Sequence, residues 1–467
     1  MSETVTATTE ITSSEPRPEP ATARNRSKDT GVGSVFVSNY PPYSAWSEEQ
    51  VAAAHAALNA PAPRPEAPLG LYLHIPFCRK RCKFCYFRVY TDKNATEIET
   101  YTDALAREIE MYAGRPAVAD RRLSFVYFGG GTPSYISNTH LEELVGRARA
   151  ALPWDAVEEV TFECEPGTLT RTKLEAIKGI GVTRLSLGIE SFDDDILREN
   201  GRAHVSKEIY RVLPWIEDQG FDQLNVDLIA GMVGESWDTW KDTVEKTLEV
   251  APDSVTVYQM ELPYNARFSA DVLAGEFDRP LADWETKRAW QDWAFERLCE
   301  EGYEQSSAYT VVRKQPEEPE KKSQFLYRDS LWHGADLLGT GVASFGHMQG
   351  VHMQNTADWG SYLEAVEAGH LPLFRAFETG PDERLTRELI LQLKLGRLET
   401  APFREKFGVD VLDRYAEPLR RLESEAMLAV HREGEEGRIE LTRRGLLQVD
   451  TLLPELYAEK YQGARYT

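Results

Sequence analysis

Short apolar runs alternate with amphipathic stretches through the middle of the chain. Runs rich in β-branched residues predict strands at 70–75, 123–128, 159–163, 184–189, 222–229 and 253–260. Apolar residues at helical spacing predict helices between them, for example at 96–113, 138–150, 205–218 and 236–248. This alternation favours parallel strands joined by right-handed crossovers. Six such units predict an α/β fold, a partial (β/α)6 version of the TIM-like barrel, with its chemistry at the carboxyl ends of the strands.

The pattern changes on both sides of this region. Residues 1–34, rich in Ser, Thr, Glu and Pro, are expected to form a disordered N-terminal tail. Residues 35–68 are expected to form an arm and linker whose aromatic stretch packs on the body or lines the site. Residues 69–300 would then form the barrel, and 301–377 its extension. Helices followed by a β-wing at 378–467 predict a mostly helical, winged-helix-like domain that acts as a lid.

The composition excludes several classes of protein. A formal charge of −23 over 467 residues argues against a nucleic-acid surface, which needs a basic face. No apolar run is long enough to span a membrane, and the polar N-terminus lacks a signal-peptide core. Five cysteines, three of them clustered, do not make a disulfide framework. We expect a cytoplasmic monomer in which Cys164 and Cys299 are inert core thiols and the charged insert 313–323 is a solvated loop.

The stretch LYLHIPFCRKRCKFCYF carries Cys78, Cys82 and Cys85 on a loop directly after a predicted strand. Three thiolates so close together suit a soft metal, and a 4Fe-4S cluster held by three of them keeps one iron open. A Cys3His zinc site with His74 is the alternative. Buried structural thiols are disfavoured, because the flanking cations Arg79, Lys80, Arg81 and Lys83 are expected to lower the thiol pKa values.

The cysteine motif is followed in order by FGGGTPS, TFECEP, RLSLGIESF, NVDLIAG and LLGTGVASF. This series resembles the radical S-adenosylmethionine (SAM) enzymes of the oxygen-independent coproporphyrinogen III oxidase-like family, which includes heme chaperones and radical methyltransferases. The resemblance implies a 4Fe-4S cluster that reductively cleaves S-adenosylmethionine to a 5′-deoxyadenosyl radical. It also implies a tetrapyrrole substrate, as in porphyrin biosynthesis, and an electron donor such as flavodoxin or ferredoxin.

The resemblance also implies which residues contact S-adenosylmethionine. They are Tyr72, Phe84, Gly130, Gly131, Thr132, Glu163, Glu190, Arg202, Asp227, Met260 and Phe345. Glycines after a strand let a ligand approach the main chain, and Phe84 could stack on adenine. Asp227 interrupts an apolar strand and needs a partner, for which Arg202 is the candidate. Glu165, in contrast, is expected to be a solvated residue at a strand end.

Several positions depart from the relatives and leave three functions open. Glu190 and Met260 stand where the oxidase has Gln and Ala, which puts a second S-adenosylmethionine in doubt, and Phe87 replaces a fourth Cys. The positions of the chaperone motif His-Asn-x-x-Tyr-Trp are held by Tyr327, Arg328, Leu331 and Trp332. Heme could then be bound by Tyr327 or by one of His333, His347 and His352.

The first hypothesis is an oxidase-like decarboxylase whose Arg202 or Arg328 contacts propionate groups. The alternatives are a heme-binding chaperone and a radical SAM methyltransferase.

Overall fold

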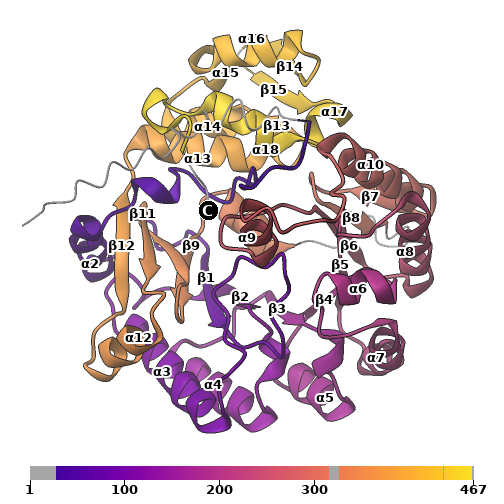
Figure 1. Ribbon diagram of the computed structural model, residues 1–467. Coiled ribbons are helices and arrows are strands. Elements are labelled where there is room, and N and C mark those ends of the chain that lie inside the picture. The colour runs from indigo at the N-terminus through magenta and orange to yellow at the C-terminus, as the bar shows by residue number, and fades with distance from the viewer. Residues whose placement is uncertain (1–27, 315–324, 435, 465–467) are drawn as a thin grey trace, which may run out of the picture.

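The computed structural model describes residues 28–314, 325–434 and 436–464. Its centre is a curved sheet in which six parallel strands follow one another in chain order (Figure 1). These strands are β1 (Leu69–Ile75), β2 (Leu123–Gly130), β3 (Glu159–Cys164), β4 (Arg184–Glu190), β5 (Gln223–Ala230) and β6 (Ser254–Gln259). All six lie where the sequence predicts them, and the partial barrel is confirmed.

Helices cover the outside of this sheet (Figure 1). They are α3 (Ala95–Ala113), α4 (Asn138–Ala151), α5 (Arg171–Gly179), α6 (Asp194–Glu199), α7 (Ser206–Gln219), α8 (Trp237–Val250) and α10 (Trp284–Glu300). Several begin at a side chain that accepts a free backbone N–H of the first turn, such as Asn94, Ser137, Thr170 and Ser236. These caps follow directly from the sequence and fix where the helices start.

The two faces of the parallel strands differ in character. Along β4, Leu185, Leu187 and Ile189 belong to the apolar core under the helices, whereas Arg184 and Ser186 line an internal cavity. Parallel strands covered on both faces are usually apolar throughout, and barrel interiors are usually filled by branched apolar residues. The polar inner positions indicate that this barrel interior accommodates a ligand.

The sheet continues beyond the barrel at both edges without closing. Next to β1 lie β9 (Asp336–Thr340), β10 (Phe345–Met348), β11 (Val351–Asn355) and β12 (Leu373–Glu378). Beyond β6 lie β8 (Thr310–Arg313) and β7 (Tyr303–Gln305). Strand β9 is parallel to β1, and the other strands added at the two edges are antiparallel to their neighbours. In Figure 1 the C-terminal domain occupies the opening between the two edges.

The C-terminal region is mostly helical, as expected. It contains α13 (Pro381–Leu393), α14 (Ala401–Phe407) and α16 (Ala416–Ser424), with a small antiparallel sheet of β13 (Arg397–Glu399), β15 (Glu436–Leu441) and β14 (Leu428–Glu433). Its apolar core also takes in Val37 and Tyr40 of the N-terminal arm. Figure 1 shows the arm running between this domain and the barrel, before α2 (Val51–Asn59) packs on the sheet extension.

The structure corrects one expectation about the N-terminal region and leaves two segments undescribed. Residues 1–27 and most of the charged insert, 315–324, lie outside the described residues. Residues 28–34, expected in the disordered tail, are instead bonded to the barrel: Gly33 N–H donates to Leu262 O at 2.8 Å, and Thr30 Oγ1 donates to Ala282 O at 2.8 Å. Among the described residues, no helix is long and apolar enough to cross a membrane.

Candidate active site

The three clustered cysteines lie on the loop after β1 and line one cavity. Thr132 Oγ1 donates to Cys78 Sγ and Arg202 Nη1 to Cys82 Sγ, each over 3.4 Å. Burial raises the pKa of Cys78 to about 11 and that of Cys85 to about 12. Three thiols at one cavity wall, two with hydrogen-bond donors at sulfur, fit an iron–sulfur cluster, because such donors tune the sulfurs and metal binding displaces the thiol protons.

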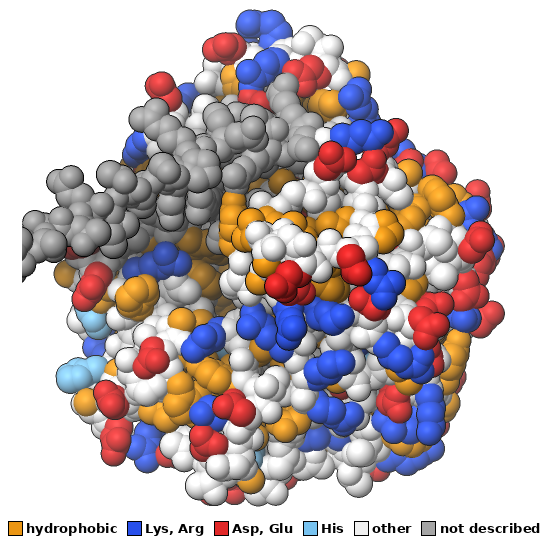
Figure 2. Space-filling view, viewed as in Figure 1, with side chains coloured by type: hydrophobic (Ala, Val, Ile, Leu, Met, Phe, Trp, Pro, Cys, Tyr) orange, Lys and Arg blue, Asp and Glu red, His pale blue; other side chains and the backbone are white. Residues whose placement is uncertain are grey.

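The cations of the cysteine loop do not act as the sequence suggested. We expected them to lower the thiol pKa values, but burial dominates. Arg79 donates to Gly167 O at 2.7 Å, Arg81 to Cys85 O and Asn265 O, and Lys83 pairs with Glu199. In Figure 2, which shows the face in the view of Figure 1, Lys and Arg side chains gather across the centre, whereas acidic side chains gather at the rim over α8 and α10.

His74 does not join the cysteines. Its Nδ1 lies 3.1 Å from Tyr72 Oη, and burial lowers its pKa to about 4. Within the described ranges, no three His, Cys, Asp or Glu side chains are arranged to hold a single metal ion. The alternative of a Cys3His zinc site therefore has no geometric support in this part of the chain.

The glycine turn after β2 passes close beneath the cysteine loop. Gly130 adopts φ +109°, and a Cβ there would lie 2.5 Å from the His74 ring. A Cβ on Gly131 would lie 2.9 Å from Ile75 O and Phe77 O, which are backbone atoms. Thr132 N–H donates to Phe77 O at 2.8 Å, and this bond joins the glycine turn to the start of the cysteine loop. Only glycine permits this approach.

Three carboxyl groups line the cavity at neighbouring strands: Glu190 is buried, and Glu163 and Asp227 are half-buried. Glu163 accepts from Tyr127 Oη at 2.6 Å and from Gly130 N–H at 3.2 Å, and burial raises its pKa to about 7. Burial also raises the pKa of Glu190 to about 7 and that of Asp227 above its ordinary value. Glu190 holds φ +67°, which is strained for a residue with a side chain. The group is suited to a cationic or hydroxyl-rich ligand.

Arg202 is not the direct partner of Asp227. Asp227 instead accepts from Ser186 Oγ at 2.8 Å and Asn225 Nδ2 at 2.9 Å. Arg202 donates to Gly188 O at 2.8 Å and to Cys82, and its Nη1 lies 3.5 Å from Glu190 Oε1. Arg202 thus connects the cysteine loop to the end of β4, a role that its place in the sequence did not reveal.

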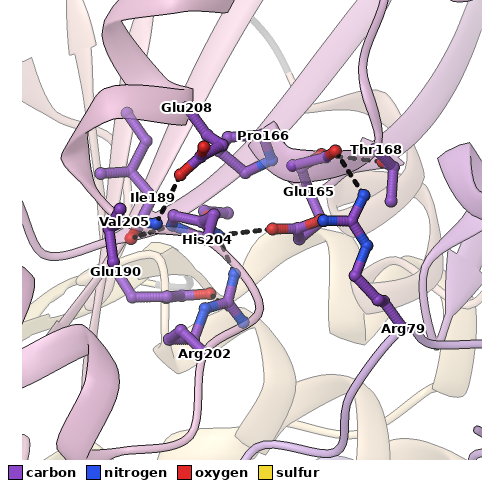
Figure 3. Close-up of polar contacts among 12 residues, drawn as sticks. Arg79, Glu165, Pro166, Thr168, Ile189, Glu190, Arg202, His204, Val205 and Glu208 are labelled. Carbon is purple, nitrogen blue, oxygen red and sulfur yellow. Dashed lines mark hydrogen bonds and ion pairs between the residues drawn. The ribbon is translucent and has the colours of Figure 1, made fainter.

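Glu165 is buried, contrary to the expectation of a solvated strand end. Its Oε1 lies 2.7 Å from His204 Nδ1, and His204 Nε2 lies 3.3 Å from Ile189 O (Figure 3). Figure 3 shows Glu165 between His204 and Arg79, with Arg202 and Glu190 alongside. This pair holds the segment that carries Arg202 against strands β3 and β4. A Glu after Cys164 and a His shortly after Arg202 gave no recognisable spacing, so the sequence did not show the pair.

The remaining predicted contacts surround the same cavity. Tyr72, Phe84, Met260 and Phe345 all line it. Phe84 packs beside Met260 in a small apolar cluster, and the Phe345 ring lies 4.4 Å from that of Tyr43 in the arm.

The four candidate heme ligands differ in whether they line the cavity. Tyr327 and His347 line the cavity, whereas His333 and His352 are not among its lining residues. Of the two single cysteines, Cys164 is buried, but Cys299 is exposed rather than part of the core.

The cavity itself has a volume of about 1290 Å³. It runs from the cysteine loop through the barrel interior and is also lined by arm residues 34–39 and C-terminal residues 446–451. Several buried cations of its wall, among them Arg184, Arg387 and Lys394, were not singled out by the sequence. Arg184 begins β4, whereas Arg387 lies in α13 and Lys394 directly follows that helix, and no motif joins the three.

Comparison with known proteins agrees with this arrangement. Residues 72–247 match the Radical SAM superfamily, and residues 380–447 match the HemN C-terminal domain. The chain is 28% identical to an oxygen-independent coproporphyrinogen III oxidase of Escherichia coli over 88% of this chain and 90% of that protein. It is 24% identical to a heme chaperone HemW of Bacillus subtilis over 80% and 96%. The solved coproporphyrinogen III oxidase (HemN) of Escherichia coli superposes with a TM-score of 0.76 at 24% identity, covering 90% of this chain and 96% of that one.

Proposed function

We propose that this chain, which carries a radical SAM domain joined to a HemN C-terminal domain, acts on a carboxylated tetrapyrrole by oxidative decarboxylation. The observation that carries the proposal is the continuity of one cavity from three cysteine thiols, past three carboxyl groups, to an aromatic and cationic interior. When bound, a 4Fe-4S cluster with S-adenosylmethionine supplies a radical that removes a hydrogen atom from the substrate.

The residues of the chain would hold the reactants and exclude water. Cys78, Cys82 and Cys85 would hold the cluster, and the glycine turn would let the cofactor reach the main chain. Glu163 and Asp227 would accept hydrogen bonds from its hydroxyl or ammonium groups. Loss of a propionate carboxyl group as CO2 also removes one hydrogen atom and one electron and leaves a vinyl group. The electron would pass to a one-electron acceptor.

Anaerobic product analysis tests the proposal. The protein is reconstituted with iron and sulfide and given S-adenosylmethionine, a strong reductant, a one-electron acceptor and coproporphyrinogen III. We expect 5′-deoxyadenosine and a product that has lost two carboxyl groups. Formation of S-adenosylhomocysteine would instead favour a methyltransferase. Cluster formation without any consumption of S-adenosylmethionine would contradict the decarboxylase.

A heme carrier is the second candidate, and a histidine pair favours it. The Nδ1 atoms of His347 and His352 lie 2.9 Å apart, and His352 Nε2 lies 3.1 Å from Tyr40 O. If His352 donates to that carbonyl, His347 donates through Nδ1 and presents a bare Nε2 at the cavity wall. Burial keeps the pKa of both rings well below 6.5, so both are neutral, as an iron ligand requires.

Heme titration under reducing conditions tests this second candidate. We expect a Soret shift near stoichiometry that His347→Ala abolishes. The matched control is His333→Ala, because His333 is absent from the cavity lining. Equal heme binding by both variants would contradict a ligand role for His347.

A further inference from the structure

Arg184 is a buried cation that faces into the barrel. It is the first residue of β4, where it pairs in register with Thr161 of β3 and Gln223 of β5. The residue is 2% exposed, yet it lines the cavity. Because Glu190 ends the same strand beside the cysteine loop, Arg184 stands at the opposite end of the barrel interior.

Among the residues that the structure describes, none forms an ion pair with the guanidinium of Arg184. Its Nε is buried without a hydrogen bond, and among the described residues its side chain makes neither a hydrogen bond nor an ion pair. Its guanidinium carbon lies over the Phe325 ring, 4.0 Å from the ring centroid. A buried guanidinium normally satisfies several of its five donors, so this one retains its capacity for a ligand.

The nearby carboxyl groups of Glu163 and Asp227 do not pair with the Arg184 guanidinium. Glu163 is bonded by Tyr127 and Gly130, and Asp227 by Ser186 and Asn225. Burial raises the pKa of both groups, and the charge of Arg184 counteracts this without direct contact. The charge of Arg184 therefore lowers the pKa values of Glu163 and Asp227 from a distance, while its N–H groups form no hydrogen bond with either carboxyl group.

The two arginines that the sequence suggested for substrate anions are already engaged. Arg202 bonds to Gly188 O and Cys82 Sγ. Arg328 bonds to Asp329 Oδ1 at 2.7 Å and to the hydroxyls of Ser306 and Ser307, each at 3.1 Å. Arg184 is thus the better candidate for binding an external anion.

Aromatic rings surround the same place. The Tyr127 and Tyr327 rings lie 4.3 Å apart, and the Phe325 ring lies 5.9 Å from that of Tyr327. Such rings favour a flat, weakly polar body, and a guanidinium favours a carboxylate in bidentate geometry. The combination suits a planar or pyrrolic ligand that carries an anionic side arm.

We propose that Arg184 anchors one carboxylate of the substrate at the end of the barrel interior remote from the cysteine loop. The inference rests on the proposed function, because it places a carboxylated tetrapyrrole in this cavity. Arg184 would be a specificity-determining residue that fixes which arm of the substrate faces the cofactor.

Equilibrium binding of coproporphyrin III and of its tetraamide, followed by fluorescence, tests the inference. For Arg184→Gln we expect about a tenfold to a hundredfold loss of affinity for the tetracarboxylate, as charge-assisted hydrogen bonds predict. Affinity for the tetraamide should change less than about twofold, because an amide cannot form the ion pair. Arg184→Lys should lie between wild type and Arg184→Gln for the tetracarboxylate.

The matched control is Arg122→Gln, which removes the same charge from an exposed ion pair with Asp155. It should bind both porphyrins as wild type does. Arg184→Gln should also melt no lower than wild type without ligand, because it removes an unpaired buried charge. A clear fall in its melting temperature, or an equal loss for both porphyrins, would mean a structural role and overturn the inference.

The outcomes separate this inference from the proposed function. Wild-type binding of coproporphyrin III that Arg184→Gln leaves unchanged overturns the inference alone. Absence of any wild-type binding overturns both. Decarboxylation by wild type with unaltered KM in Arg184→Gln would likewise exclude an anchoring role.

Discussion

At the level of single residues, burial shifts the pKa values of several titratable side chains in the site. The thiols of Cys78 and Cys85 and the carboxyl groups of Glu163 and Glu190 are all shifted toward their neutral forms by desolvation. A metal or a cationic ligand would reverse this preference, because it stabilises the anionic form. The part of the cavity around these thiols and carboxyl groups is therefore suited to binding cationic groups.

Replacement of one clustered cysteine should prevent assembly of the proposed cluster. We expect Cys82→Ala to lose most iron and sulfide after reconstitution and to lose cleavage of S-adenosylmethionine, because two thiolates hold a cluster poorly. The control is Cys299→Ala, an exposed cysteine outside the cavity lining, which should retain both. Iron analysis and visible absorption provide the measurement. Full iron content in Cys82→Ala would rule out its role as a ligand.

A methyl group at the glycine turn should disturb the cysteine loop. Gly131→Ala would place a methyl group against the backbone carbonyls of Ile75 and Phe77, which cannot yield as the end of a flexible side chain can. We therefore expect a loss of about 1–3 kcal/mol in unfolding free energy. Gly146→Ala is the control: it lies within α4 with open space around it and should gain about 1 kcal/mol. Denaturant titration compares the two. Equal effects would show that the turn tolerates a side chain.

At the scale of elements, the N-terminal arm is tied to the end of β6. Glu261 accepts from Val35 N–H at 2.8 Å and Phe36 N–H at 3.0 Å through Oε1, and from Ser34 Oγ through Oε2. A short extended segment has few apolar contacts of its own, so these bonds to one carboxyl group fix its path along the cavity.

Removal of Glu261 should release the arm. We expect Glu261→Ala to increase hydrogen exchange and proteolysis around residues 34–39, while Glu261→Gln keeps the arm in place because its amide can preserve all three bonds. Burial raises the pKa of Glu261 to about 7 from 4.5. Glu261 therefore contributes its full stabilisation below its ordinary pKa of 4.5, and this contribution is lost as the pH rises through the raised pKa of about 7.

Glu261→Gln does not titrate. Its stability relative to wild type should therefore increase between about pH 5 and about pH 8, by on the order of 2 kcal/mol. Denaturant titrations at both pH values measure the difference. A constant or decreasing difference would contradict the assigned shift.

At the scale of the whole molecule, one carboxylate joins three parts of the chain. Asp450 of the C-terminal domain lies 2.8 Å from Lys394 Nζ and accepts from Val37 N–H of the arm at 2.9 Å. It also accepts from Tyr309 Oη, next to β8, at 2.5 Å. Lys394 is 1% exposed, so the arrangement depends on its partner.

Loss of this carboxylate should weaken the whole assembly. We expect Asp450→Ala to lower the unfolding free energy by about 3–5 kcal/mol, because it leaves a buried ammonium uncompensated. The double variant Asp450→Ala with Lys394→Met should recover part of this loss. Asp413→Ala, which removes an exposed ion pair with Arg432, should cost less than about 1 kcal/mol. Similar losses for Asp450→Ala and Asp413→Ala would show that the buried carboxylate is dispensable.

The order of strands and helices, the partial barrel and the cysteine loop can all be predicted from the sequence. Alternation of apolar runs with amphipathic stretches is a local signal, and Cys78, Cys82 and Cys85 are close enough in the chain to be recognised together. The motifs after successive strands could be assigned to one end of the barrel because parallel strands end at the same edge.

The contacts between side chains of different elements become visible only in the folded structure. The pairing of Glu165 with His204, the engagement of Arg202 by the cysteine loop and the open donors of Arg184 depend on distances between segments far apart in the chain. The thiol pKa values of Cys78 and Cys85 differ from the expectation for the same reason: flanking charges are visible in the sequence, whereas burial is a property of the packed fold.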